Sequence, residues 1–462
     1  MFAALLALLL IGPTTDWHPL RTDGTIDARV HGIWQTRGYG MVMDVGAHEV
    51  RVYNVGRAGC LPDEETAYYV NNGLEVFSRA GDVLRVAYRP TNSTVYTTDR
   101  IDALPAACAT PPSDSPTEVF DYLWHSMDEY YAFFELRGID WDARRAAIAP
   151  RIRDGMSDED LFDALSDLLD GFNDGHLTLN AEIDGAERSY STRRSKVLAD
   201  ALKRGFKAQT EIETEGEFSG RWFFGNRRMI RETVLDSTTV GRASGGNIVW
   251  GRRGRIGYIV LGGMMGFAED GDESLAGDIA GAHVGMNAAL TDLADTDAIV
   301  FDLAFNQGGY DEISLAIASH FANEPTLGLT KYAFMNEADT RQAFTVEPTP
   351  GVRYLKPVTL LTSDLTVSAA ETFTMEMRAL PNVTHVGEPT NGALSDILFR
   401  PLPNGWTLEL SHEVYLDAEG ELWENRGIPP DVPITVFALD DLGSYVSTVT
   451  GVMDWLNATL DS

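Results

Sequence analysis

The feature that most restricts the fold is a set of continuous apolar runs in the second half of the chain. The runs lie at Ile256–Leu261, Ala298–Leu303 and Pro357–Thr362. An apolar run without polar alternation is typical of a parallel strand buried on both faces. Helical patterns lie between and after the runs, at residues 276–293, 312–322 and 369–380. We therefore predict a parallel sheet covered by helices, an α/β core over residues 255–440 that ends in a hairpin meander near residues 397–410.

The rest of the chain divides into segments of different pattern. Alternating β-branched and aromatic residues predict a small β-rich domain, and a proline-rich linker separates it from amphipathic helices. One segment of mixed charge has weak periodicity and predicts no clear module. The predicted divisions are an apolar N-terminal segment (1–22), the β-rich domain (23–110), a helical subdomain (111–180), an intervening segment (181–254), the core (255–440) and a C-terminal helix (441–462).

The N-terminus and the cysteines bear on where the protein resides. Residues 1–12 are apolar and have the length of a secretory signal peptide, but they lack its basic leading residues. An export signal and a buried N-terminal element both remain open. In an exported protein the two cysteines, Cys60 and Cys108, would form a disulfide, whereas the alternative is two unrelated buried thiols. We predict the Cys60–Cys108 disulfide and an exported, periplasmic or secreted protein.

The charge of the chain excludes some partners. There are 36 basic and 69 acidic side chains, so the formal net charge is −33. Nucleic-acid binding needs basic surface, and anionic membranes repel an acidic protein. Beyond the N-terminal segment no stretch is long and apolar enough to predict a transmembrane helix. We expect no nucleic-acid partner and no stable membrane span in the mature chain.

Common catalytic signatures are absent, but one serine lies in a suggestive place. The sequence holds no phosphate-binding loop, no zinc-binding His-Glu-x-x-His and no Gly-x-Ser-x-Gly. Ser368 joins a buried strand to a helix, where free N–H groups and the helix dipole can stabilise an oxyanion. Ser368 with Glu371 three residues later also fits a helix capping box. From these residues alone, a nucleophile and a cap both remain open.

Two other loops could supply partners for Ser368. His176 lies in a helix-to-strand turn, although an isolated loop histidine is usually a surface residue. Gly308 and Gly309 follow a buried strand, and glycines allow a backbone to approach a ligand closely. A serine needs a neighbouring base to become a nucleophile. The three features together therefore favour acyl-transfer chemistry.

In these features the sequence resembles a family of serine peptidases. The family includes the C-terminal processing (tail-specific) proteases, the tricorn core protease and the interphotoreceptor retinoid-binding modules. The resemblance covers roughly residues 118–435, and its motifs, highly specific as a set, lie at 168–176, 256–259, 301–309, 361–371, 387–392, 402–406 and 424–431. It implies an α/β (α+β) fold in which a crotonase- or ClpP-like ββα core carries the helical subdomain and the N-terminal β-rich domain.

The resemblance also implies roles for single residues. Ser368 would be the nucleophile, and the backbone N–H groups of Ala369 and Gly308 would form the oxyanion hole. The tricorn-like branch uses a histidine base oriented by a glutamate, which correspond here to His176 and Glu424. Whether Glu424 would act directly or through another side chain is left open.

The sequence departs from the family in ways that bear on the base. The processing-protease branch uses a lysine in a Thr-x-Gly-Lys segment, but here that segment ends in Ala393, and no lysine follows Lys356. A Ser-Lys dyad is therefore excluded. Gly175 stands where tricorn has a serine, and Ala304 replaces an arginine that would form a buried ion pair near the oxyanion loop. No inserted peptide-gripping module is evident.

We therefore predict a serine peptidase that cleaves peptide or protein substrates through an acyl-enzyme, without metal or organic cofactor. Two alternatives remain: a non-catalytic ligand- or peptide-binding protein on the same fold, and a general esterase. The sequence indicates neither the preferred cleavage site nor the oligomeric state.

Overall fold

The computed structural model describes residues 16–192, 197–208, 214–269, 272, 274–438 and 444–461. Residues 1–15, which hold the apolar run predicted as an export signal, lie outside this part. Within it, no helix combines the length and the apolar character needed to cross a membrane.

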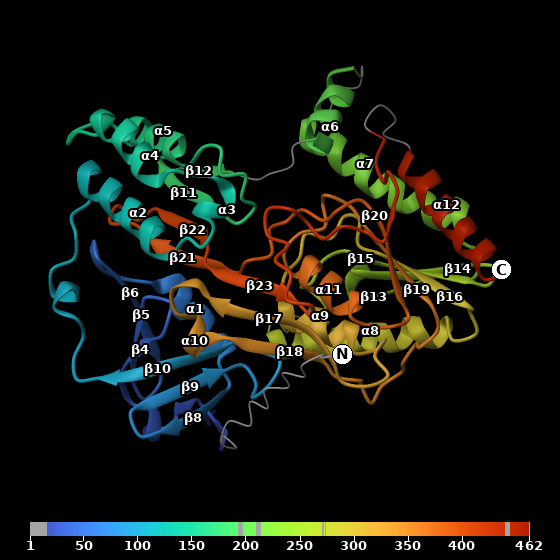
Figure 1. Cartoon of the computed structure of the whole chain (residues 1–462), viewed down its shortest axis with the longest axis horizontal. Helices are drawn as coiled ribbons and strands as arrows, with labels where there is room; N and C mark the ends of the chain where they lie inside the picture. The colour runs from blue at the N-terminus through green and yellow to red at the C-terminus, as the bar shows by residue number, and fades with distance from the viewer. Residues whose placement is uncertain are drawn as a thin grey trace, which may run out of the picture.

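A seven-stranded sheet forms the centre of the core (Figure 1). Its strands run parallel from β15 to β24, while β14 and β13 extend it in antiparallel fashion. The three apolar runs are three neighbouring strands in its middle, as the sequence predicted. In spatial order the strands are β13 (Gly241–Ala243), β14 (Ile248–Arg253), β15 (Ile256–Leu261), β16 (Ala298–Asp302), β19 (Val358–Thr362), β20 (Val383–Gly387) and β24 (Val432–Pro433).

Helices cover both faces of this sheet. One face packs against α8 (Leu275–Asp292), α9 (Asp311–Ala318) and α11 (Ala369–Arg378). The other packs against α7 (Glu215–Met229), the π-helical turn Ile230–Val234 and α12 (Ser444–Thr459). In β16, Ile299 and Phe301 enter the first cluster and Ala298 and Val300 the second, because successive side chains of a strand point to opposite faces. Burial on both faces explains the continuous apolar run.

The helical subdomain shares its core with a hairpin from the C-terminal half. Its helices are α2 (Pro116–Tyr130), α3 (Phe134–Arg137), α4 (Trp141–Ile148) and α5 (Asp158–Leu169). They pack on a sheet of order β12 (Ala186–Ser191), β11 (Thr178–Ile183), β22 (Thr407–Ser411) and β21 (Ile397–Pro401). The sequence-based divisions placed this hairpin in the α/β core. Strand pairing across more than 200 residues joins it to the helical subdomain instead.

The N-terminal region forms an eight-stranded antiparallel sheet. The sheet begins at β1, before residue 23, where the sequence-based division started, and α1 (Glu64–Gly73) packs beside β6. In spatial order its strands are β1 (His18–Pro19), β8 (Val76–Ala80), β9 (Val83–Ala87), β10 (Val95–Ile101), β4 (Gly32–Thr36), β5 (Met41–Val45), β6 (Val50–Gly56) and β7 (Gly59–Pro62). A small ladder joins β2 (Arg21–Thr22) to β3 (Thr25–Ile26).

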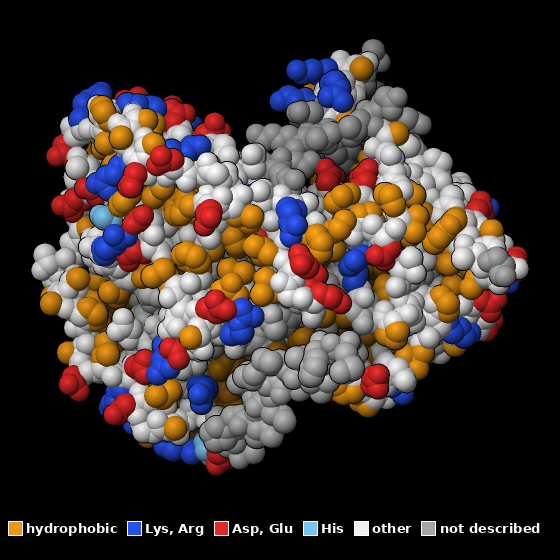
Figure 2. Space-filling model, in the orientation of Figure 1, with side chains coloured by type: hydrophobic (Ala, Val, Ile, Leu, Met, Phe, Trp, Pro, Cys, Tyr) orange, Lys and Arg blue, Asp and Glu red, His pale blue; other side chains and the backbone are white. Residues whose placement is uncertain are grey.

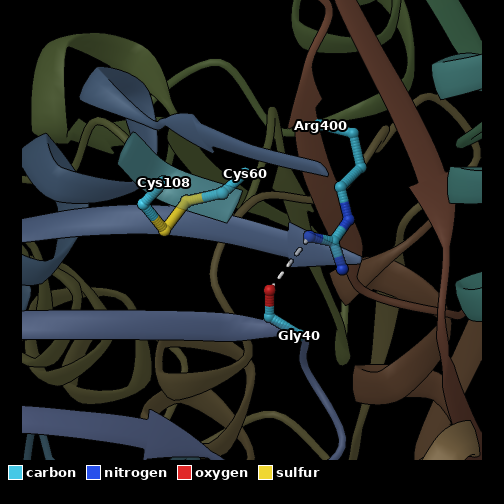
Figure 3. The surroundings of a disulfide bond; sticks show 4 residues. All are labelled: Gly40, Cys60, Cys108 and Arg400. Atoms are coloured by element: carbon cyan, nitrogen blue, oxygen red, sulfur yellow. Dashed lines mark hydrogen bonds between the residues drawn. A yellow bond between two sulfur atoms is a disulfide. The ribbon is translucent and has the colours of Figure 1, made fainter. Parts of the chain in front are cut away.

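The predicted disulfide is present between Cys60 on β7 and Cys108 (Figure 3). Close to it, Arg400 on β21 enters the N-terminal sheet. Its guanidinium donates to the carbonyl oxygen of Gly40 at 3.3 Å and to that of Tyr39 at 2.9 Å, and it lies over the Tyr130 ring. The buried Arg400 thereby joins the N-terminal sheet to the β21–β22 hairpin.

Two further elements complete the described fold. A sheet of β18 (Gln342–Val346), β17 (Thr326–Ala333) and β23 (Glu413–Asp417) lies between the N-terminal sheet and the core, with α10 (Glu337–Thr340) beside it. The intervening segment, which predicted no module, contains the helix pair α6 (Val197–Ala208) and α7. The space-filling view shows a notch between the lobe with α4 and α5 and the lobe with α6 and α7 (Figure 2).

Candidate active site

Ser368 lies at the N-terminus of α11 in a strained backbone conformation. Its φ and ψ are 59° and −128°, whereas an ordinary N-cap residue has extended backbone angles. Such a conformation costs on the order of 1–3 kcal/mol in a non-glycine residue and persists only where neighbours impose it. Here the Ser368 N–H donates to the Ala393 carbonyl oxygen at 3.0 Å and to Glu371 Oε2 at 3.2 Å. In α/β-hydrolases a strained strand-to-helix turn likewise presents the nucleophilic serine.

Gly308 touches Ser368 from the loop after β16. A Cβ atom built on Gly308 would lie 2.7 Å from Ser368 Cβ and 2.8 Å from the Ala369 nitrogen, and its φ is +92°. Only glycine fits this contact. The Gly308 N–H donates to Asn306 Oδ1 at 2.9 Å, while the Val367 N–H donates to the Asn306 carbonyl oxygen at 3.1 Å. The glycine loop and the serine loop are thus fixed to each other.

Two buried carboxylates hold the segment 390–395. Glu371 accepts from the Thr390 hydroxyl at 2.6 Å and from the N–H groups of residues 392 and 393 at 2.7 and 2.9 Å. Glu424 Oε2 accepts from the N–H groups of residues 394 and 395 at 2.9 and 3.1 Å. Four consecutive N–H groups are therefore satisfied by two side chains. This segment includes Ala393, which the resemblance places where the processing-protease branch has its lysine.

The loop of His176 contacts the same segment. A Cβ on Gly175 would lie 2.9 Å from Ala393 Cβ, so the two backbones meet closely. His176 is 7% exposed, and its N–H donates to Asp174 Oδ1 at 2.9 Å. Because Ala393 also accepts the Ser368 N–H, it contacts both the histidine loop and the serine. The structure thus brings together the loops predicted to carry the base and the nucleophile.

A buried arginine connects Glu424 to the histidine loop. Arg137 Nη2 lies 2.6 Å from Glu424 Oε1 and 3.3 Å from Asp174 Oδ2, and its side chain is 1% exposed. Its Nη1 donates to the Asn173 carbonyl oxygen at 2.7 Å. Asp174 is fully buried and also accepts from the Tyr131 hydroxyl at 2.7 Å. Both Glu424 oxygens therefore have partners, and Glu424 reaches the histidine loop through Arg137.

Burial shifts the titration of both glutamates. It raises the pKa of Glu371 to about 7, against the opposing effect of the four hydrogen bonds that the carboxylate accepts. It raises the pKa of Glu424 to about 8, reinforced by the charge of Asp174 and opposed by that of Arg137. Both carboxyls thus bind protons more tightly than exposed glutamates do.

The loop that carries Ala304 is supported without the family's arginine. The fully buried Asp302 accepts from the Tyr258 hydroxyl at 2.6 Å, from the Tyr445 hydroxyl and from the Ala304 N–H at 2.9 Å. Burial raises the pKa of Asp302, which the two tyrosine hydrogen bonds oppose. Two tyrosine hydroxyls therefore hydrogen-bond to this carboxyl. The resemblance had implied the loss of an ion pair near this loop.

Sequence reasoning missed Arg137, Asp174 and the bracing role of Glu371. Asp174 could have been found from its place two residues before His176 in a tight loop. No local sequence pattern indicates the role of Arg137, because its partner Glu424 is 287 residues away in the chain. No group of three or more His, Cys, Asp or Glu side chains is arranged to hold a metal ion within the described ranges.

Comparison with protein families gives two matches. Residues 255–434 match peptidase family S41, and residues 112–170 match the C1 domain of tricorn protease. The first match contains Ser368, Gly308, Ala393 and Glu424, and the second contains Arg137.

Solved structures with a similar fold include several peptidases. A candidate peptidase from Parabacteroides merdae ATCC 43184 is 25% identical, with a TM-score of 0.57 over 74% of this chain and 97% of that one. Mature CPAF complexed with lactacystin is 13% identical, with a TM-score of 0.52 over 75% and 98%. The tricorn protease is 13% identical, with a TM-score of 0.44 over 92% of this chain and 46% of that one.

Proposed function

We infer that this chain, a serine peptidase of peptidase family S41, hydrolyses peptide bonds with Ser368 as nucleophile and His176 as general base. The observation that carries the proposal is the strained backbone of Ser368 at the start of α11, pressed against Gly308 and bonded to Ala393. A helix cap needs no such conformation. Strain at this place has a use if it presents the serine hydroxyl to a substrate carbonyl.

The chemistry follows the serine acyl-transfer scheme. Ser368 Oγ attacks the carbonyl carbon of the scissile bond while the His176 imidazole takes the hydroxyl proton. The imidazolium then donates that proton to the leaving amine, and the C–N bond breaks. Water, deprotonated by the same imidazole, then attacks the acyl carbon. The bond from this carbon to Ser368 Oγ breaks, the imidazolium returns its proton to Oγ, and the acid is released.

The oxyanion would be stabilised beside the helix N-terminus. The Ala369 N–H is the first of α11, and the first N–H groups of a helix have no intrahelical acceptor. The second proposed donor, the Gly308 N–H, is bonded to Asn306 Oδ1 in the free protein. When the oxyanion forms, the Gly308 N–H would donate to it, and the bond to Asn306 would lengthen or be shared. Asn306 would keep the peptide plane in its orientation.

Glu424 and Arg137 act as positioning residues in this proposal. Glu424 fixes the segment 394–395 and holds Arg137, and Arg137 fixes Asp174 and the Asn173 carbonyl. The imidazole is thereby held relative to the serine through backbone contacts. A misplacement of about 1 Å in such a site costs on the order of 100-fold in rate.

No lysine competes for the role of base at the family position. That position is Ala393, and Lys331 is buried against Glu413 at 2.9 Å and the Tyr415 hydroxyl at 2.9 Å. The proposal therefore rests on His176. Residence outside the cytoplasm is proposed as well, because the Cys60–Cys108 disulfide is stable in oxidising compartments.

A fluorophosphonate probe tests the proposal directly, because it reacts with activated serines. We expect labelling of the wild-type protein, none in Ser368→Ala, and a loss of at least 100-fold in the labelling rate in His176→Ala. The controls are Ser447→Ala and His48→Ala, which alter exposed residues. Equal labelling of wild type and Ser368→Ala in folded protein would refute the proposal.

Peptide substrates separate a peptidase from an esterase. Wild type, but not Ser368→Ala, should cleave unmodified peptides in a mixture analysed by mass spectrometry. Cleavage of p-nitrophenyl esters without cleavage of any peptide would favour the esterase alternative.

A further inference from the structure

A cavity of about 430 Å³ lies beside the glycine loop. Ligand sites typically have volumes of about 300–1,000 Å³. The residues that line it include Leu202, Trp222 and Phe223 from α6 and α7, and Phe305, Gln307 and Leu365 from the core.

The cavity opens at the carboxyl ends of three neighbouring parallel strands. Gly262 follows β15, Phe305 and Gln307 follow β16, and Leu365 follows β19. Ligands of parallel sheets bind in the crevice outside these ends. Gln307 is bonded in the chain to Gly308, which touches Ser368, and Leu365 precedes Ser368 by three residues. The cavity therefore lies next to the loops that carry Gly308 and Ser368.

The wall of the cavity is built before any ligand arrives. The Phe305 ring contacts Trp222 at 5.5 Å and Phe223 at 4.9 Å between centroids, both edge to face. The polar side-chain groups among the described lining residues are those of Gln307 and Ser219 and the indole N–H of Trp222, and none of these residues is charged. A charged substrate side chain would find no opposite charge among these lining residues.

We propose that this cavity binds a large apolar side chain of the substrate, such as Phe, Leu or Met, at a residue next to the scissile bond. The inference rests on the proposed function and specifies the substrate class of the same site. The volume admits one such side chain, and burial of its apolar surface drives binding. A bulky apolar residue in a peptide would thereby place the neighbouring carbonyl at Ser368.

The helix pair α6–α7 acquires a function from this proposal. Residues 197–229 lie between the two family matches, at 112–170 and 255–434. Ser368 and Gly308 belong to the match at 255–434, while Leu202, Trp222 and Phe223, like His176, lie outside both matches. We therefore assign cleavage preference in part to a segment outside the family models.

Cleavage profiling with variants of the cavity tests the inference. Wild type is incubated with a peptide mixture, and cleavage sites are read by mass spectrometry. The best peptide is then compared with its alanine version at the apolar position. We expect wild type to prefer the large residue by about 10-fold or more in kcat/KM, because a pocket of this kind discriminates by about that factor. Ser219→Trp, which fills the cavity, should abolish the preference while Ser368 still reacts with the fluorophosphonate.

Phe223→Ala provides a second variant, and Phe224→Ala its matched control. Both rings lie on α7, but Phe224 is 68% exposed and does not line the cavity. Phe223→Ala should weaken the preference, and Phe224→Ala should retain it, with melting curves showing that each variant is folded. A wild-type profile without apolar preference, or a preference unchanged in both Ser219→Trp and Phe223→Ala, overturns the inference. In both of these outcomes Ser368 is still labelled by the fluorophosphonate. If the proposed function is wrong, Ser368 of the wild-type protein is not labelled.

Discussion

Two regions adjoin Ser368 and differ in almost every physical property. The first, called here the polar brace, comprises Arg137, Asp174, Glu371, Glu424 and the segment 390–395. Its side chains are buried and joined by ion pairs and hydrogen bonds as short as 2.6 Å. The second is the apolar cavity of the preceding section, whose walls are aromatic and aliphatic.

The difference indicates a division of labour. Charged networks in a buried site have few alternative arrangements, because any rearrangement leaves a charge without a partner. Apolar walls tolerate exchanges of similar volume. The polar brace is therefore suited to fixing the catalytic geometry. The walls of the cavity can vary, and the preference for substrate side chains can vary with them. Four predictions follow, in decreasing order of their effect on stability.

The largest effect is expected from breaking the polar brace at Arg137. Arg137→Met leaves Asp174 buried without its cation and removes a hydrogen-bond donor from Glu424, which should lower the free energy of unfolding by about 3–5 kcal/mol. The rate of Ser368 labelling in the folded protein should fall by about 100-fold. Chemical denaturation and probe kinetics measure the two effects.

Arg151→Met serves as the control, because it breaks an exposed ion pair with Asp167 that contributes little. Arg137→Lys should restore part of the stability but less of the labelling rate, since lysine lacks the fork that contacts both acids. A variant Arg137→Met that labels at the wild-type rate would remove Arg137 from the positioning role.

Loss of the disulfide should lower the stability of the protein without changing its activity. Replacing Cys60 and Cys108 together by serine opens a loop whose ends are 48 residues apart, which should cost about 4 kcal/mol in the unfolding of the N-terminal sheet. The labelling rate of the folded protein should not change, because neither cysteine contacts the polar brace or the cavity. The midpoint of denaturation and the labelling rate at 25 °C check both statements. A slower rate in folded protein would show that the N-terminal sheet contributes to the site.

The titration of Glu371 should lower the free energy of unfolding as the pH rises. Its pKa is about 7 in the folded protein, above the 4.5 that is usual for a glutamate in an unfolded chain. The folded state therefore keeps a proton that the unfolded state loses, and stability present below pH 4.5 is lost as the pH rises toward 7. The shift corresponds to about 3 kcal/mol.

Comparison with Glu371→Gln isolates this contribution from other buried groups. The excess stability of wild type over the variant should shrink between pH 5 and pH 7, as measured by denaturation at several pH values. A difference that grows over this interval would show that the carboxylate is ionised in the folded protein well below pH 7.

The sequence predicted the core because its signals are local. The apolar runs at Ile256–Leu261 and Pro357–Thr362 and the helix after Ser368 are found within a few residues of their predicted bounds. The contacts that assemble the polar brace are not local, and neither Arg137 nor the β21–β22 hairpin could be placed by periodicity. The residues alone offered His176 as a candidate partner of Ser368, and the family resemblance assigned it the role of base. In segment 181–254 the amphipathic pattern of α6 was missed, whereas α7 has a weaker pattern and packs Trp222 and Phe223 against the core.

The smallest effect on stability, and the sharpest test of the polar brace, comes from the contact of Gly175 with Ala393. A methyl group on Gly175 would lie 2.9 Å from Ala393 Cβ, so Gly175→Ala forces the histidine loop away from the segment that bonds Ser368. Overpacking of this kind costs about 1–3 kcal/mol. We expect slower labelling of Ser368 as well, measured with the same probe.

The compensating exchange decides whether that contact is responsible. Ala393→Gly removes the methyl group with which the new one collides, so the double variant Gly175→Ala/Ala393→Gly should recover both stability and labelling rate relative to Gly175→Ala. Such recovery is a coupling between two residues that lie 218 positions apart in the sequence, and independent sites would show additive losses instead. Additive losses would mean that the histidine loop and the serine are not positioned through Ala393. Recovery would show that the close contact of Gly175 with Ala393 helps to set the distance between base and nucleophile, beside the ion pairs of Arg137.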